Sequence, residues 1–287
     1  MKPANHLVST AFREDFAQAK LEELEFPTSL DASRRVLKAV EDPDIGLASL
    51  AKIVIAEPLL SAKVVRLANS AAMNPAGLAV RDVRQAVTRI GLDPVKAVAM
   101  ILILNQLRQF SSHAGTRQLA DRLWERSVSV SALAYVIAKK MTLLNPDEAM
   151  FAGIVHDLGR FFLLARAGDY PDLLENPAAL AETVNDLNEQ ATRRLLEALE
   201  LPSAAVDAVT SSSDDGTPRS LAMRTLGDVL FAAKALSPRP DPFATLDARE
   251  SATGDAAEAL AFDQDTIAEV IAASGDEIYS IIIALES

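Results

Sequence analysis

The segment 150–160 reads Met150-Phe151-Ala152-Gly153-Ile154-Val155-His156-Asp157-Leu158-Gly159-Arg160. An apolar run leads into a His-Asp doublet, and this pattern predicts a buried helix that ends at the doublet. An imidazole and a carboxylate are typical ligands of a divalent metal ion, which needs several such donors converging from different parts of the chain. The chain has only three histidines, His6, His113 and His156, and no cysteine. The sequence therefore predicts an incomplete metal centre.

The composition favours helices over sheet, because Ala and Leu are abundant while glycine and aromatic residues are few. The length suits one large domain or two lobes. The lack of cysteine excludes disulfides and thiolate metal sites and suits the cytosol. The first residues lack the apolar core of a signal peptide, and the longest apolar run, 97–104, is far shorter than the roughly 18 residues that cross a bilayer. We therefore expect a cytoplasmic protein with no membrane partner.

Charge is unevenly distributed along the chain. Residues 1–140 hold 19 Lys and Arg against 14 Asp and Glu, whereas residues 141–287 hold 9 against 26. A basic half can indicate nucleic-acid binding, but this excess is mild, and the acidic half would repel phosphates. The charge pattern favours two lobes with complementary fields over a nucleic-acid partner. A nucleic-acid interface would require one shared exposed face for Arg66, Arg81, Arg84, Arg89 and Lys96.

Apolar residues recur at helical spacing along most of the chain, and no segment shows the alternation of a strand. Glu57-Pro58 and Asn145-Pro146 are typical helix starts, and Gly91 is a typical helix end. We expect helices at about 30–40, 47–54, 58–68, 80–90, 95–107, 116–141, 146–156, from 161 onward, and at 178–200, 203–211, 219–236 and 264–284. The fold class is therefore all-α.

The helices divide into two lobes. A polar linker at 110–116 predicts the boundary, with an N-terminal arm at 1–13, an N-terminal helical lobe at 14–112 and a second helical lobe at 113–287. The segment 237–255 is rich in Pro and Asp, which predicts a mobile loop within the second lobe.

Short motifs follow one another between residues 20 and 236. They are Leu24-Glu25-Phe26-Pro27, Asp42-Pro43-Asp44, Glu57-Pro58-Leu59-Leu60, Arg66-Leu67-Ala68-Asn69-Ser70-Ala71, Ala86-Val87-Thr88-Arg89-Ile90-Gly91-Leu92 and Leu123-Trp124-Glu125-Arg126-Ser127. In this order they resemble the HDOD family, the HD-related output domain of bacterial signalling proteins, which usually has Asp at the position of Glu57. The resemblance implies an N-terminal helical bundle packed on an HD-like helical lobe.

The resemblance also places the positions of a metal cleft in this chain. His156 and Asp157 conform to the HD pattern, and Asp228 matches its closing Asp. Arg126 stands where HD proteins have their first histidine, and Asn188 stands where relatives often keep another. The family's paired histidines correspond to Ser211-Ser212 or its neighbour.

The resemblance therefore implies a vestigial cleft, because a guanidinium cannot ligate a cation. Its members are Arg126, His156, Asp157, Asn188 and Asp228. We expect neither a metal ion nor another cofactor there. We expect Arg126 to occupy the place of the ion and to pair with both Asp157 and Asp228. The implied function is non-enzymatic signalling through contacts with other signalling proteins; the alternative is a metal-dependent phosphohydrolase that acts on nucleotides or cyclic dinucleotides.

Other interpretations, most of them purely structural, apply to the same residues. His156 and Asp157 can simply lock a helix end, or they can retain a weak metal site or hold another ligand. Trp124 and Tyr135 suit the core. Asn69-Ser70 suits a helix cap and turn; alternatively Arg66, Asn69 and Ser70 face a partner protein.

Overall fold

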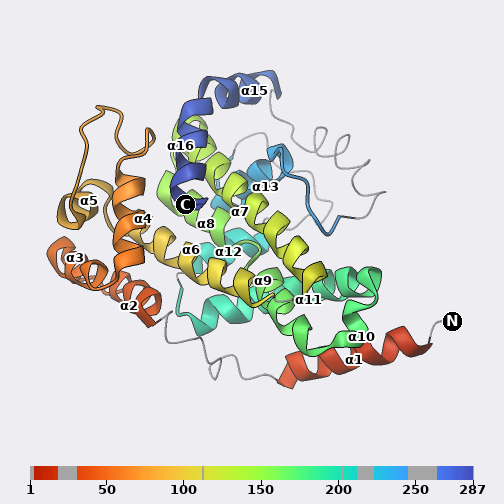
Figure 1. Ribbon diagram of the computed structural model, residues 1–287. Coiled ribbons are helices and arrows are strands. Elements are labelled where there is room, and N and C mark those ends of the chain that lie inside the picture. Colours follow the sequence, from red (N-terminus) through yellow and green to blue (C-terminus); the bar gives the residue numbers. More distant parts are fainter. Residues whose placement is uncertain are drawn as a thin grey trace.

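The computed structural model describes residues 3–18, 31–111, 113–201, 203–211, 223–244 and 264–286. Within these ranges every regular element is a helix, which confirms the all-α prediction (Figure 1). The helices are α1 (Pro3–Gln18), α2 (Asp31–Val40), α3 (Leu47–Ile55), α4 (Pro58–Ala68), α5 (Val83–Ile90), α6 (Leu92–Phe110), α7 (Ala114–Met141), α8 (Pro146–Val155), α9 (Leu158–Arg166), the short 3-10 helix η3 (Ala167–Asp169), α10 (Pro171–Leu174), α11 (Pro177–Ala198), α12 (Ser203–Ser211), α13 (Leu226–Leu236), α15 (Gln264–Ala273) and α16 (Gly275–Glu286). None of the described helices is long and apolar enough to cross a membrane.

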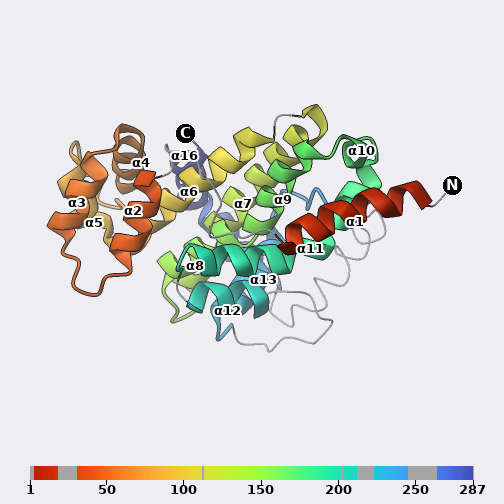
Figure 2. The ribbon, with the colours of Figure 1, turned by 90° about the horizontal axis from the view of Figure 1, so that it is seen from below.

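Helices α2 to α5 form a small group at one end of the molecule (Figures 1 and 2). Each buries an apolar stripe, such as Leu60, Val64 and Leu67 on α4, because residues three and four apart share one face of a helix. Gly91 ends α5 with a φ of 78°, a left-handed conformation that glycine adopts without steric conflict. The chain can therefore turn at once from α5 into α6.

Helix α6 is the common core of the two groups. Residues 94–101 are all buried, as is typical of a central helix that is apolar nearly all round. On one side α6 contacts α2, α4 and α5, and on the other it contacts α8 and α9.

The second group is built around the long helix α7, and its most extensive helix pair is α7 with α8. The two backbones approach closely at Gly153, where an added Cβ would lie 2.5 Å from the Cα of Ser131. The Ser131 hydroxyl donates to the Met150 carbonyl at 3.1 Å. Close packing against α7 therefore fixes α8 and the doublet that follows it.

Helix α1 packs on the second group of helices. It lies along α11 and beside α10 (Figure 2), and Arg194 Nη1 donates to the Phe16 carbonyl at 2.8 Å. Residues 14–18 were assigned from sequence to the N-terminal lobe, yet they pack with the second one. The reason is the apolar side of α1, where Phe16 lies against the Phe162 ring with centroids 6.4 Å apart.

The C-terminal helix connects the two groups. Helix α16 packs on α7 and also on α4, where Lys63 Nζ donates to the Leu285 carbonyl at 3.1 Å. Burial lowers the pKa of this Lys63 amine. The single helix expected at 264–284 is in fact two, α15 and α16, which meet at Ser274 and Gly275.

Candidate functional site

The His-Asp doublet lies between α8 and α9, where local signals place it. Asn145 caps the start of α8 by accepting the Asp147 N–H at 2.9 Å, and Pro146 follows as the first helical residue. The helix ends at His156, whose N–H donates to the Ala152 carbonyl at 3.1 Å. His156 and Asp157 are only 4% and 2% exposed, so both depend on the protein for polar partners.

Both nitrogens of the His156 ring face oxygen atoms. Nδ1 lies 2.7 Å from the Gly153 carbonyl oxygen, which can only accept a hydrogen bond. Nε2 lies 3.0 Å from Asp157 Oδ2, an ion-pair distance with an angle outside that of a hydrogen bond. The His156 ring is therefore held between two oxygen atoms of its own segment, those of Gly153 and Asp157.

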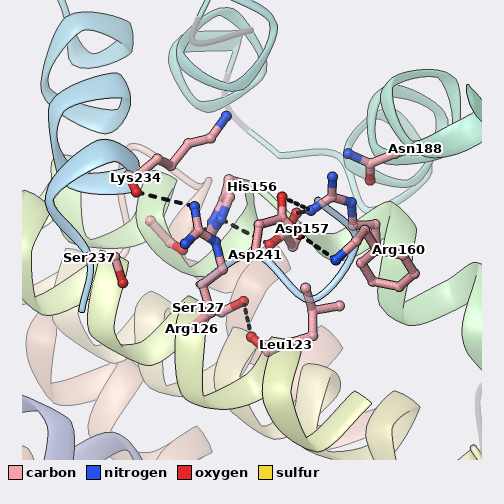
Figure 3. A network of polar contacts seen from close by, with 12 residues as sticks. Leu123, Arg126, Ser127, His156, Asp157, Arg160, Asn188, Lys234, Ser237 and Asp241 are labelled. Atoms are coloured by element: carbon pink, nitrogen blue, oxygen red, sulfur yellow. Dashed lines mark hydrogen bonds and ion pairs between the residues drawn. The ribbon is translucent and has the colours of Figure 1, made fainter. Parts of the chain in front are cut away.

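Asp157 is surrounded by positive charge. Arg160 Nη1 lies 3.1 Å from Asp157 Oδ1 and 2.9 Å from Asp241 Oδ2, so one guanidinium joins two carboxylates (Figure 3). Burial alone would raise the pKa of Asp157, but the His156 ring and Arg160, with a smaller contribution from Arg126, hold that pKa well below its usual range. Asp157 is therefore ionised at neutral pH.

Arg160 also anchors the segment 237–244. Its Nη2 donates to Asn185 Oδ1 at 2.9 Å, and its guanidinium lies 5.0 Å from the centre of the Phe243 ring. This segment belongs to the stretch 237–255 that the sequence predicts to be mobile; residues 245–255 lie outside the described residues. In the part from 237 to 244, Asp241 forms an ion pair and Phe243 a ring contact with Arg160 of α9.

Arg126 is buried in the cleft, as expected, but its partners differ from the prediction. Its Nη1 donates to the Arg239 carbonyl at 2.6 Å and its Nη2 to the Lys234 carbonyl at 3.2 Å. Neither Asp157 nor Asp228 forms an ion pair with it within 4.0 Å. The prediction that Arg126 pairs with both carboxylates is wrong: it fastens α7 to the end of α13, and Arg160 takes the carboxylate.

Asp228 serves a different purpose from the one predicted. Its Oδ2 accepts from the Thr225 N–H at 2.9 Å, while the Thr225 hydroxyl accepts from the Asp228 N–H at 3.1 Å. This reciprocal pair is a capping box at the start of α13, and Asp228 does not line the cleft. The spacing Thr225-x-x-Asp228 is a capping signal that the sequence contained.

The cleft encloses a cavity of about 70 Å³. It is lined by Arg126, His156, Asp157, Arg160, Asn188, Glu189, Thr192, Val209, Lys234 and Asp241. Four of the five residues expected from sequence are thus brought together, and the sequence missed Arg160, Lys234 and Asp241. Arg160 follows Asp157 by three residues, a spacing that places both on one side of a helix turn. No local signal connects Asp241 to the doublet. Ser211 lies at the end of α12, and Ser212 is outside the described residues.

These residues do not fit a metal ion. Within the part of the chain that the structure describes, no three His, Asp or Glu side chains converge as a ligand set. The doublet supplies one imidazole and one carboxylate, and the cations Arg126, Arg160 and Lys234 line the same cavity. Their positive charge opposes a divalent cation. Burial also lowers the pKa of Lys234.

The residues expected to face a partner are only partly on the surface. Ser70 is 7% exposed. Asn69 is used internally, because its Oδ1 accepts from the Val80 N–H at 2.8 Å and its Nδ2 donates to the Val80 carbonyl at 2.7 Å. Burial contradicts the partner-facing prediction for Ser70. Asn69 and Arg66 are both exposed, and Asn69 in addition fastens the loop before α5.

The condition set for nucleic-acid binding also fails. Lys96 is 6% exposed and lies 3.7 Å from Asp93, and Arg89 donates to the Ala68 carbonyl at 3.2 Å. The five cations named for that interface do not share one exposed face.

Comparisons with known proteins agree with this architecture. The family model of the HDOD domain matches residues 26–214. A protein of Shewanella amazonensis, provisionally described as a metal-dependent phosphohydrolase, superposes with a TM-score of 0.75 at 23% identity over 98% of this chain and 99% of its own.

Two further structures are similar. An HDOD domain protein of unknown function from Geobacter sulfurreducens has a TM-score of 0.65 at 21% identity, covering 98% of each chain. A protein of Marinobacter aquaeolei, provisionally described as a signal transduction protein, has a TM-score of 0.61 at 19% identity over 97% of this chain and 66% of its own. These identities indicate a shared fold. No curated protein matches the chain.

Proposed function

The chain belongs to the HDOD family, and from this premise we propose that it is a non-enzymatic signalling protein of the cytoplasm that acts through contacts with other proteins. The observation that carries the proposal is the presence of two guanidinium groups, those of Arg126 and Arg160, in the cavity at the His156-Asp157 doublet. A metal phosphohydrolase needs an ion that acidifies water and polarises the phosphoryl oxygen. The residues present favour an ion-pair network in place of that ion.

Both residues of the doublet, His156 and Asp157, support the same proposal. Asp157 is already occupied by His156 and Arg160, and the His156 ring is oriented toward two oxygen atoms. A metal ion would have to displace these contacts and approach three cationic side chains. The doublet therefore acts as a lock between α8, α9 and the segment that contains Asp241.

Contacts with other proteins are supported by the surface of the N-terminal group of helices. Ile55 and Leu59, on either side of the turn between α3 and α4, are 47% and 58% exposed. Large apolar side chains close together on a surface are typical of protein-binding sites. We propose this surface as the partner contact.

The alternative is a metal-dependent phosphohydrolase. It is favoured by the His156-Asp157 doublet and by the likeness to a fold whose Shewanella member carries that description. The two functions differ in whether a divalent ion bound at the doublet supports turnover.

The test is hydrolysis of cyclic dinucleotides, nucleotides and an aryl phosphate with added Mn²⁺, Mg²⁺, Fe²⁺ or Ni²⁺. We expect no turnover above that of His156→Ala. The matched control is His113→Ala, since His113 is exposed at the start of α7. Turnover that needs metal, is lost in His156→Ala and is kept in His113→Ala would contradict the proposal.

A gain-of-function variant sharpens the test. Arg126→His removes a cation from the cavity and adds a potential ligand beside the doublet. It should bind Mn²⁺ more tightly than the wild type in calorimetric titration. Equal binding by the wild type and Arg126→His would show that the guanidinium does not exclude the ion.

The partner contact is tested once cross-linking in the host has identified a binding protein. Leu59→Glu should weaken that complex about tenfold or more, as expected for a central apolar residue of an interface. Leu143→Glu is the control, because Leu143 is fully exposed between α7 and α8, away from the proposed surface. If both variants weaken the complex equally, or if neither weakens it, the proposed partner contact is contradicted.

A further inference from the structure

Arg126 carries a charge that lacks a carboxylate counter-ion. Its side chain is 7% exposed, and its two hydrogen bonds go to the main-chain carbonyls of Lys234 and Arg239. No described carboxylate lies within 4.0 Å of it. A guanidinium has five N–H donors, and a buried charge normally has a charged partner. The cavity that Arg126 lines is where such a partner could lie.

The acidic residues of the cavity are held by other cations. Asp157 is paired with His156 and Arg160, Asp241 is paired with Arg160, and Glu189 is paired with Arg193. Figure 3 shows these contacts grouped around the Arg160 guanidinium, whereas Arg126 extends from α7 toward the end of α13. The Arg126 guanidinium therefore has no carboxylate of the described residues within ion-pair distance.

The cavity has the size of a small oxyanion. Its volume of about 70 Å³ is several times the roughly 10–15 Å³ that one water molecule needs, which leaves room for the five non-hydrogen atoms of a phosphate group. Lys234 and Asn188 also line it. An ammonium group and an amide are further hydrogen-bond donors, and guanidinium groups bind phosphate at two points.

We propose that this cavity binds a phosphate group through Arg126, without a metal ion, with Lys234 and Asn188 as additional donors. The phosphate is either inorganic phosphate or the terminus of a phosphomonoester. Binding would fasten α7 to α11 and to the end of α13, so the protein would respond to the ligand without converting it. This inference rests on the proposed function, since it assumes that no metal ion occupies the cleft.

The test is calorimetric titration of the full chain with inorganic phosphate in the presence of EDTA. The wild type should bind phosphate at a single site, and Arg126→Gln should bind it about tenfold more weakly or worse, because the variant loses a charge-assisted hydrogen bond to the anion. Arg122→Gln is the matched control, since it is the same change at an exposed residue of α7, one turn earlier. Lack of binding by the wild type, or equal binding by both variants, would overturn the proposal.

A second variant avoids any loss of folding at Arg126. Asn188→Asp places a negative charge at the cavity from α11 with little change in shape, and it should also weaken phosphate binding. Unchanged affinity in a folded Asn188→Asp protein would contradict the site. Titration with glycerol phosphate then separates the two sources: tighter binding than inorganic phosphate indicates an ester, and weaker binding indicates the free ion.

These outcomes are distinguishable from failure of the proposed function. Phosphate binding is measured with EDTA present, whereas hydrolysis is measured with added metal ions. Metal-dependent turnover would refute the non-enzymatic proposal, while loss of phosphate binding would refute only this inference.

Discussion

The two ends of α8 carry carboxylates with opposite electrostatic surroundings, a half-buried one at its start and a buried one just beyond its end. At the start of the helix, burial and the nearby Asp93 raise the pKa of Asp147 to about 6. Just beyond its end, His156 and Arg160 overcome the effect of burial and hold the pKa of Asp157 well below its usual range. One short helix therefore separates a carboxylate that resists ionisation from one that is always ionised.

The two pKa values differ because different charged residues from elsewhere in the chain lie near each end of α8. Arg160 and, through it, the distant Asp241 reach the end of α8, whereas the start of α8 faces another acid across the contact with α6. Burial disfavours charge at both ends, and only paired charge reverses the effect. We therefore expect the end of α8 to support stability and its start to weaken it slightly.

Asp157→Asn should have the largest effect. It leaves His156 and Arg160 beside a neutral amide in a buried site, and loss of one partner of such a cluster typically costs about 3–5 kcal/mol. The free energy of unfolding, from denaturant titration at neutral pH, is the measurement. Asp172→Asn, an exposed acid on α10, is the control and should change it little. A loss equal to that of the control would mean that the cluster is not stabilising.

Arg160→Met should have the next largest effect. It removes the cation that joins Asp157 to Asp241 and lies against Phe243, and we expect a loss of about 2–4 kcal/mol, as for other buried charge networks. Amide hydrogen exchange should also increase in residues 237–244. The control is Arg166→Met on the exposed end of the same helix, whose partner Asp169 is itself exposed. Unchanged exchange at 237–244 would contradict the anchoring role.

How far the sequence predicts this structure depends on whether the signal is local. Helix starts at Pro58 and Pro146 and the turn at Gly91 are confirmed, because capping and backbone preferences act within a few residues. The all-α class follows from the same periodicity. The close approach of Gly153 to α7 depends on packing between helices, which periodicity does not define.

The site shows the limit of the same reasoning. The family pattern placed Arg126, His156, Asp157 and Asn188 at one cavity, but it assigned Arg126 a carboxylate that Arg160 takes. Asp241 is 81 residues from Arg160, and its neighbourhood suggested only a loop. Pairings of that kind are set by the tertiary fold, because several acids and bases of the chain could satisfy each charge equally well.

Acid titration tests the same comparison of the two ends of α8, through a smaller change in the free energy of unfolding. Because the folded state lowers the pKa of Asp157, ionised Asp157 stabilises the protein above the unfolded pKa of about 4, and this contribution is lost as pH falls below it. The free energy of unfolding should fall by up to about 1.4 kcal/mol for each pH unit from this group. The gap between the wild type and Asp157→Asn should narrow from pH 4 to pH 2, while Asp172→Asn follows the wild type. A constant gap would mean that Asp157 does not titrate in this way.

Asp147→Asn should have the smallest effect on the free energy of unfolding, and this effect should be stabilising at pH 7. A folded pKa of about 6 means that the folded state binds a proton more readily than the unfolded chain, so stability decreases as pH rises from about 4 to 6 and stays reduced above that. Asn cannot ionise, and the variant should be more stable than the wild type at pH 7. Solvent screens this partly exposed group, and the loss of a negative charge from the first turn of α8 acts against the gain, so we expect about 1 kcal/mol or less.

Thermal unfolding of both proteins between pH 4 and pH 7 is the measurement. The advantage of Asp147→Asn should grow through that window and vanish near pH 4. Glu148→Gln is the control, because Glu148 is the next residue of the same turn and its Oε1 accepts from Asn145 Nδ2 at 3.4 Å. A variant that is less stable than the wild type at pH 7 would show that the helix dipole outweighs the repulsion from Asp93, and the two ends of α8 would then both favour their negative charge.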